Sequence, residues 1–311
     1  MPSPHLSISA LPEVIKKVAH AMPVRRSQMA NWAIDILRLH KPFVGRFMGM
    51  PMEVHPLEAA SRSAYFLGFY EREVTIWALE FFKKQQPQMI FDVGTNFGYL
   101  VYLALSQIKN PTIYGFEPDP YNEIWLKNNL RLMGAGDNVK IETVAVSDRV
   151  GSVRFTPSNP NSHENLWAGM NFKKEASVGE IEVPSISLDQ FCADKKITQV
   201  DLVKMDIEGA EGYAVDGMVD GLKKKLFKNI LLELHPQFLS GEHSSEKIIA
   251  RILDQGYYGY HFVSPFAKQQ SHDKTHGFYN MIWDPAFLKP MDKHKPDIQF
   301  WEHVLFSAES I

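Results

Sequence analysis

The residues of this chain that could do chemistry gather where short apolar runs end. The first run, MIFDV at 89–93, continues into a turn that carries Gly94 and Gly98 before a helical stretch begins. Glycines let the backbone approach a ligand closely, and the free N–H groups of a helix N-terminus favour a carboxylate or phosphate. The spacing is G-x-x-x-G, whereas dinucleotide sites carry G-x-G-x-x-G. The turn therefore predicts an anion-binding site and disfavours, without excluding, a pyrophosphate.

The second feature is Glu117, which ends the apolar run TIYGFE and follows Gly94 by 23 residues. An acid at the end of the second strand of such a unit can accept hydrogen bonds from both hydroxyls of a ribose. S-adenosylmethionine has this diol and no pyrophosphate, so it suits the turn better than NAD does. The alternative interpretation is structural: the glycines form a tight turn, and Glu117 caps a helix before Pro118.

Acids and a histidine follow two later apolar runs. Asp206, Glu208 and Glu211 come at and just after the end of DLVKM, and Glu233 and His235 end the run NILLELH. Ligands of open α/β sheets bind at the carboxyl ends of strands, so we expect these side chains at a reaction site. A neutral imidazole with a pKa of about 6.5 can accept a proton at pH 7, which makes His235 the predicted general base. Asp206 and Glu208 are expected to position cofactor and substrate.

Other interpretations of these residues stay open. Acids in a first helical turn complement the helix dipole, which is the structural alternative for Glu211, and His235 could cap its strand. A divalent metal is conceivable on four hard or borderline ligands at this edge, namely Asp206, Glu208, Glu233 and His235. Paired acids more often orient a substrate or a cofactor, so we predict a site without a metal.

The elements that position these residues alternate in type. From about residue 70 onward apolar runs alternate with helical stretches, which predicts βαβ units around a mainly parallel sheet with helices on both faces. The expected strands are 88–93, 112–117, 139–146, 200–206 and 229–235. The runs 258–263 and 277–283 are expected to form a terminal antiparallel pair.

Two regions fall outside this alternation. Residues 1–68 are predicted to form a helical N-terminal extension, because apolar residues recur at helical spacing from 11 to about 45. This extension could be a packing arm or lid, part of the acceptor pocket, or a homodimer contact. The catalytic domain then covers 69–311 and contains an inserted hairpin at 150–187. We expect His163 and Trp167 at the hairpin tip to shape the acceptor pocket, although Trp167 could be a core residue instead.

Composition limits the classes of partner and compartment. Lys and Arg number 33 against 36 Asp and Glu, a net charge of -3 that disfavours nucleic acid as a partner. The single cysteine, Cys192, suits a reducing compartment. The sequence has no apolar window of about 18 residues and no signal-peptide pattern. We therefore expect a cytoplasmic protein that does not insert stably into membranes.

Several of these segments together resemble the FkbM family of S-adenosylmethionine-dependent methyltransferases. They lie within residues 68–236 and are, in chain order, GFYERE, DVGTNFGYL, FEPDP, AVSD, SLDQF, DLVKMDIEGAE and ILLELHP. The resemblance implies an α/β, class I methyltransferase fold with a Rossmann-like, mainly parallel seven-stranded sheet. It also implies transfer of a methyl group from S-adenosylmethionine to oxygen. The acceptor implied is a small molecule or glycan, commonly a hydroxyl of a sugar or of a polyketide-like natural product.

The resemblance also assigns residues. Those that it implies for cofactor binding are Glu71, Asp92, Gly94, Thr95, Asn96, Gly98, Glu117, Pro118, Ala145, Val146 and Asp206. Asp206, Glu208 and Glu211 match the acidic motif at a strand end, and we expect Glu211 and Glu233 to contact the acceptor. Thr95 stands where the family more often has alanine, a small change within the turn.

Two competing functions come from other classes. A nicotinamide-dependent oxidoreductase is disfavoured by the missing third glycine of the turn. A catalytically inert cofactor-binding scaffold is disfavoured by the acids and His235 at the strand ends. A DNA or RNA methyltransferase is disfavoured by the acidic charge balance and by the absence of an Asn-Pro-Pro-aromatic sequence after the fourth strand.

Overall fold

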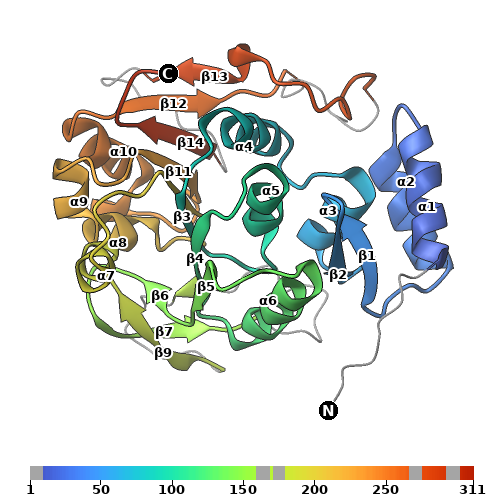
Figure 1. Cartoon of the computed structure of the whole chain (residues 1–311), viewed down its shortest axis with the longest axis horizontal. Helices are drawn as coiled ribbons and strands as arrows, with labels where there is room; N and C mark the ends of the chain where they lie inside the picture. The colour runs from blue at the N-terminus through green and yellow to red at the C-terminus, as the bar shows by residue number, and fades with distance from the viewer. Residues whose placement is uncertain (1–9, 159–168, 171–178, 266–274, 292–301) are drawn as a thin grey trace.

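The computed structural model describes residues 10–158, 169–170, 179–265, 275–291 and 302–311, and the chain is drawn in Figure 1. The helices are α1 Ala10–Ala21, α2 Arg26–Ile36, α3 Ala59–Leu67, α4 Arg72–Gln85, α5 Tyr99–Gln107, α6 Pro120–Met133, α7 Leu188–Lys195, α8 Glu211–Asp216, α9 Val219–Lys223 and α10 Ser245–Asp254. Short 3₁₀ turns cover η1 Gly241–His243 and η3 Pro285–Phe287. The strands are β1 Phe43–Phe47, β2 Met50–Val54, β3 Met89–Val93, β4 Thr112–Phe116, β5 Val139–Glu142, β6 Ala145–Val146, β7 Gly151–Thr156, β8 Gly169–Met170, β9 Ile181–Ile186, β10 Leu202–Met205, β11 Asn229–Leu234, β12 Tyr258–Phe262, β13 Leu288–Pro290 and β14 Glu302–Ser307.

Among the described residues, the central sheet has eight strands in the order β13-β12-β14-β11-β10-β3-β4-β5. The five strands from β11 to β5 are parallel to one another. β14 is antiparallel to both β11 and β12, and β13 is antiparallel to β12. Chain order runs outward in both directions from β3 and β10, and ligands of open α/β sheets bind at such a switch point. The predicted α/β fold with a mainly parallel sheet is confirmed.

Two details of the predicted sheet were wrong. The sheet has eight strands instead of seven because Leu288–Pro290 adds the short edge strand β13, where the missing N–H of Pro290 is tolerated. The segment 277–283 forms a turn and an irregular stretch instead of a strand. A turn begins there because Gly277 has a φ of 89°, and β12 pairs with β13 and β14 instead.

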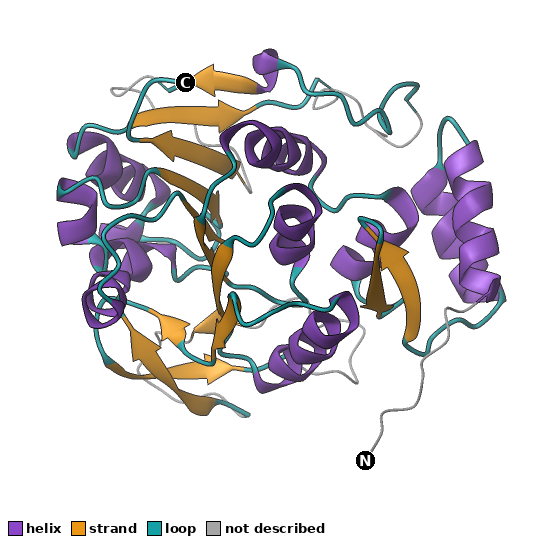
Figure 2. Cartoon of the chain, in the orientation of Figure 1, coloured by secondary structure: helices purple, strands orange, loops and turns teal. Residues whose placement is uncertain are grey.

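Helices cover both faces of this sheet. In Figures 1 and 2, α4, α5 and α6 lie on one face and α7, α8, α9 and α10 on the other. Neighbouring strand residues point to opposite faces, so Ile90 packs into the cluster that includes α4 and α5, while Phe91 packs into the cluster that includes α7 and α10. Strands buried on both faces read as continuous apolar runs, which is why the sequence reveals them.

The inserted hairpin is present, with β7 antiparallel to β9 in a second sheet of order β6-β9-β7-β8. The expected single strand 139–146 is divided, because β5 joins the central sheet while β6 pairs in parallel with β9. His163 and Trp167 at the predicted tip lie outside the described residues.

The N-terminal region, predicted to be a helical extension, contains the helices α1 and α2, but it is not helical throughout. Residues 43–54 form the antiparallel hairpin β1-β2, and α3 follows it. Met48 and Gly49 at its turn have φ values of 49° and 78°, a pair of positive angles typical of two-residue hairpin turns. No helix among the described residues has both the length and the apolarity that a bilayer span requires.

Side chains of α5 and α6 attach this hairpin to the central sheet. The Trp125 Nε1–H donates to the carbonyl oxygen of Glu53 at 3.0 Å, and the Tyr102 hydroxyl donates to that of Pro51 at 2.8 Å. Apolar residues of α1, α2, α3 and the hairpin belong to the same buried cluster as those of α4 and α5. The N-terminal region therefore packs on one face of the sheet through α4, α5 and α6.

Candidate functional site

The turn after β3 is shaped by its backbone. Gly94 has a φ of 81°, and a Cβ atom there would overlap the carbonyl oxygen of Asp206. Gly98, with a φ of 94°, is the N-cap residue directly before α5. The Thr95 hydroxyl donates to the carbonyl oxygen of Asp92 at 2.7 Å and closes the turn. We call residues 94–98 the Gly94 turn; it lies at the switch point between β3 and β10.

Glu117, at the end of β4, is fixed to the Gly94 turn by hydrogen bonds. Its two carboxylate oxygens accept from the backbone N–H of Asn96 at 2.7 Å and from that of Asp119 at 3.0 Å. Burial raises the pKa of Glu117 to about 7, although these backbone N–H groups oppose the rise. Pro118 sits between Glu117 and Asp119, and the Asp119 side chain caps α6. Backbone donors thus orient the predicted ribose-binding acid.

Two polar atoms beside this turn are buried without a hydrogen-bond partner among the described residues. They are Oδ2 of Asp92 and Oδ1 of Asn96. Burial raises the pKa of Asp92 to about 7, against the opposing charge of Lys204. A buried polar atom without a partner costs free energy, so both atoms are available to a ligand seated in the turn. Ala145 and Val146, which the resemblance assigned to cofactor binding, are buried in β6, within two hydrophobic clusters.

His235 is the centre of a cluster of acids that we call the His235 cluster. Its Nδ1 lies 2.9 Å from Oε1 of Glu211. Its Nε2 lies 3.3 Å from Oε2 of Glu208, 3.7 Å from Oε1 of Glu233 and 3.9 Å from Oδ1 of Asp206. The imidazole side chain is only 1% exposed. The structure thus brings together the five strand-end residues that the sequence analysis selected.

The electrostatics of His235 differ from the expectation of an unperturbed imidazole. Burial lowers its pKa, but the hydrogen bond and charge of Glu211 and the charges of Glu208 and Asp206 outweigh burial and raise the pKa to about 9. The ring is therefore protonated at pH 7 in this state. Burial, with the neighbouring acids, raises the pKa of Glu208 to about 8 against the opposing charge of His235.

Glu211 lies beneath His235 with no exposed surface. Its Oε1 also accepts from the backbone N–H of Gly209 at 3.1 Å, which fixes the carboxylate. In this conformation Glu211 contacts the imidazole and not the surface that an acceptor would approach. Glu208 has a φ of 51°, a left-handed conformation that is uncommon for a residue other than glycine and that recurs at functional sites.

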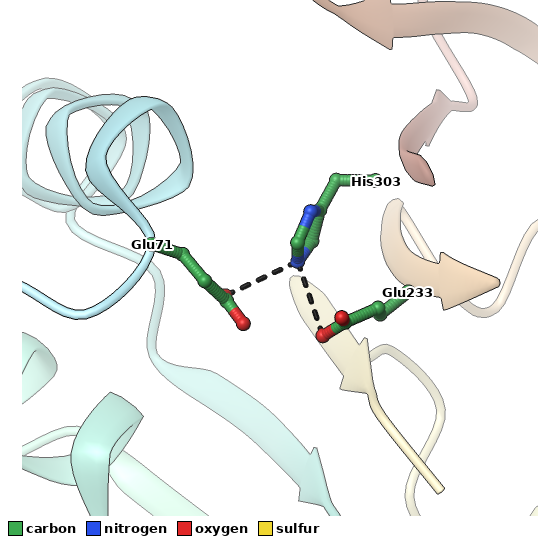
Figure 3. A group of neighbouring side chains, drawn as sticks. All are labelled: Glu71, Glu233 and His303. Carbon is green, nitrogen blue, oxygen red and sulfur yellow. Dashed lines mark ion pairs between the residues drawn. The ribbon is translucent and has the colours of Figure 1, made fainter. Parts of the chain in front are cut away.

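A second group, which we call the His303 triad, comprises Glu71, Glu233 and His303 (Figure 3). Nε2 of His303 lies 3.2 Å from Oε2 of Glu71 and 3.2 Å from Oε2 of Glu233. Burial alone would raise the pKa of Glu71, but the nearby charge of His303 outweighs burial and lowers the pKa to about 2. Burial and the charges of Asp206 and Glu71 raise the pKa of Glu233 to about 7. Glu233 therefore faces both histidines.

The sequence analysis missed two members of this edge. His303 starts the apolar run HVLF, whose strand pattern could have indicated β14. Lys204 lies within β10, and its Nζ contacts Oδ2 of Asp206 at 3.0 Å. Burial lowers the pKa of Lys204, but the charges of Asp206 and Asp92 outweigh it and raise the pKa overall. Nothing in a single sequence indicates that a lysine inside an apolar strand points to this edge.

The assembled edge carries more acidic than basic groups. Its carboxyl groups belong to Glu71, Asp92, Asp206, Glu208, Glu211 and Glu233, and its basic groups to Lys204, His235 and His303. Such an edge favours a cationic ligand, and S-adenosylmethionine carries both a sulfonium and an ammonium group. The described residues include two sets with ligand atoms close enough to hold a metal ion, the His303 triad and the set Asp206, Glu208 and His235.

Comparison with known proteins places this site in a family context. Residues 92–258, more than half of the chain, match the Methyltransferase FkbM domain. The 2-O-methyltransferase NoeI of Sinorhizobium fredii is 29% identical over 161 residues, which cover 47% of this chain and 63% of NoeI. The hexuronic acid methyltransferase AglP of Haloferax volcanii is 24% identical over 226 residues, 71% of this chain and 83% of AglP.

The name of a third relative specifies a 31-O position of FK506. The 31-O-demethyl-FK506 methyltransferase FkbM of Streptomyces tacrolimicus is 26% identical over 173 residues, which cover 47% of this chain and 65% of that protein. The chain thus spans less than two thirds of the length of NoeI and of FkbM.

Proposed function

Since this chain belongs to the FkbM methyltransferase domain family, we propose that it transfers a methyl group from S-adenosylmethionine to a hydroxyl oxygen of a sugar, glycan or polyketide-like molecule. The names of the three relatives support this acceptor class, because they specify a 2-O position, a hexuronic acid and a 31-O position. The cofactor, when bound, supplies an electrophilic methyl group on a positively charged sulfur.

One observation carries the proposal: the Gly94 turn and the His235 cluster meet at one switch point, where Gly94 touches the backbone of Asp206. The turn offers the N-terminus of α5 to a carboxylate, and Glu117 offers oriented oxygens to a ribose. The unpartnered atoms of Asp92 and Asn96 and the acidic surplus of the edge fit a polar, cationic cofactor. The residues present therefore suit S-adenosylmethionine.

In this proposal His235 accepts the proton of the acceptor hydroxyl. Glu211 holds Nδ1, and Nε2 faces Glu208, Glu233 and Asp206, among which the acceptor hydroxyl would bind. The ring must be neutral to act as a base. A positive charge bound beside it lowers the pKa of His235, because like charges disfavour the protonated form. His235 would therefore be neutral more often with the cofactor bound, and Glu211 keeps the ring oriented in both protonation states.

Methyl transfer also depends on alignment. Holding the acceptor oxygen in line with the methyl group makes a bimolecular step effectively unimolecular. This alignment can supply a large part of the rate acceleration. Asp206, Glu208 and Glu233 present oxygens on three sides of Nε2 and are suited to accept hydrogen bonds from a polyhydroxylated acceptor. We assign them to acceptor and cofactor positioning.

The test is a transfer assay with isotopically labelled S-adenosylmethionine. The protein is incubated with neutral glycosides, uronic acid glycosides and a fractionated extract, and the labelled product is identified by NMR. We expect label on an ether oxygen. Label on nitrogen or carbon would contradict the assignment, as would tighter binding of NAD than of S-adenosylmethionine in a parallel titration.

A further inference from the structure

His303 has no role in the proposed methyl transfer, although it contacts Glu233, which the proposal does use. We propose that Glu71, Glu233 and His303 bind one divalent transition-metal ion. The three side chains come from separate elements, since Glu71 precedes α4, Glu233 lies on β11 and His303 on β14 (Figure 3). β11 and β14 are hydrogen-bonded neighbours in which Glu233 pairs directly with His303. Two of the ligands therefore rest on a rigid sheet.

The distances in the triad match those within a metal coordination shell. Zinc binds histidine nitrogen and carboxylate oxygen at about 2.0–2.2 Å, so neighbouring ligand atoms lie about 3.0–3.5 Å apart, between octahedral and tetrahedral angles. Nε2 of His303 is 3.2 Å from a carboxylate oxygen of Glu71 and 3.2 Å from one of Glu233. All three ligand atoms lie within 4.8 Å of one another.

A second observation concerns the direction of the imidazole. Nε2 of His303 is buried and has no hydrogen bond of acceptable geometry, although two carboxylates lie at ion-pair distance. Figure 3 shows this nitrogen at the apex between Glu71 and Glu233. The nitrogen thus faces the space between the two carboxylates, where an ion bound to all three groups would lie. Glu233 itself is 8% exposed, so a ligand-free carboxylate there is poorly solvated.

The charges around the triad are compatible with a cation. Lys204 is the nearby lysine, and it is engaged by Asp206 at 3.0 Å. Two carboxylates and a neutral imidazole would leave a bound divalent ion electrically balanced. Imidazole and carboxylate together suit zinc, manganese and iron, whereas magnesium prefers an all-oxygen shell. The alternative occupant of the triad is a proton on His303, with an ion pair to each glutamate.

Titration of the whole chain with metal ions distinguishes these two states. The protein is freed of metal with a chelator, and binding of Zn²⁺, Mn²⁺ and Mg²⁺ is measured by calorimetry without cofactor. We expect one equivalent of Zn²⁺ or Mn²⁺ and weaker binding of Mg²⁺. His303→Gln and Glu233→Gln should each weaken binding by about 100-fold or more, because loss even of an outer-shell partner costs 10–100-fold.

His243→Gln is the matched control, because His243 pairs with Asp216 outside this edge and its loss should leave metal affinity unchanged. His235→Gln tests the neighbouring set, and it should also leave the first equivalent in place. Where a triad variant fails to fold, Mn²⁺ is added to the unmodified protein and broadening of the His303 ring signals is followed by NMR. Absence of binding, unchanged binding in both triad variants, or loss only in His235→Gln overturns the proposal. None of these readouts depends on methyl transfer.

Discussion

The Gly94 turn and the His235 cluster lie at the same edge of the sheet, but they are built in different ways. The turn is a run of five consecutive residues whose shape follows from two glycines with positive φ, and backbone N–H groups orient Glu117 beside it. The cluster consists of charged side chains from the segment between β10 and α8, the first residue of α8, β11 and the residue after β11, held by one another. Cofactor recognition therefore depends on local backbone shape, whereas the acid and base chemistry depends on long-range assembly.

The largest expected effect breaks the turn. Gly94→Ala places a Cβ atom on the carbonyl oxygen of Asp206, so the turn must shift. A displacement of about 1 Å can cost about 100-fold in function, and we expect cofactor affinity to fall by at least that factor in a calorimetric titration. Gly134→Ala is the matched control, since Gly134 has a φ of 71° with open space around it. It should lower stability by about 1–2 kcal/mol and leave affinity intact. Equal cofactor affinity in the two variants would contradict the role of Gly94.

The second prediction removes the centre of the cluster. His235→Ala should lower kcat by about 10²–10⁴, the range for a lost general base, and cofactor Kd should not rise, because the substitution removes a like charge. Glu211→Gln should give an intermediate loss, because the ring keeps its place but loses the carboxylate that orients it. Steady-state kinetics and calorimetry check both variants. Full kcat in His235→Ala would transfer the base role to another group or show that positioning suffices.

The third prediction tests how much the side chain of Glu117 contributes to cofactor affinity at the Gly94 turn. Glu117→Ala should weaken cofactor binding by about 1.5–3 kcal/mol, because the ribose hydroxyls lose a charged acceptor. Catalysis at saturating cofactor should change little. Unchanged affinity by calorimetry would remove Glu117 from the cofactor site.

The smallest expected effect is a pH dependence of cofactor affinity that comes from Glu117 beside the Gly94 turn. Burial raises the pKa of Glu117 to about 7, so the ionised form that best accepts from a ribose prevails above that pH. Cofactor affinity should rise by up to about tenfold between pH 6 and pH 8. Glu117→Gln lacks this ionisation, so subtracting its pH profile isolates the contribution of Glu117. Identical profiles in the two proteins would show that other groups cause the dependence.

The same contrast explains how much the sequence could reveal. The buried strands and the Gly94 turn are local patterns, so β3, β4, β10 and β11 could be predicted, as could the acids that follow β10. His235 and its acids could be selected because they end strands that share an edge. The pKa of His235 could not be predicted from the sequence, because it depends on the distance to Glu211 and on burial.

Contacts between distant segments escaped prediction for the same reason. His303 and Glu71 meet only because β14 lies beside β11 and α4 begins at that edge. The sequence pattern predicts a helical region where the hairpin β1-β2 forms. The strands of the hairpin are short and include Gly45 and Pro51, which weaken a strand pattern. Its position is fixed by Tyr102 and Trp125, which come much later in the chain.

The position of β14 between β11 and β12 also has a consequence for synthesis. β12 emerges from the ribosome before the strand that separates it from the rest of the sheet, and Ser307 at the end of β14 follows Phe262 by 45 positions. At about 5–20 residues per second, β12 waits about 2–9 s for its partner. During that interval both β11 and β12 expose an unpaired edge, the feature that promotes wrong pairing with other chains. Translation speed over this stretch should therefore influence how much of the protein reaches its native sheet.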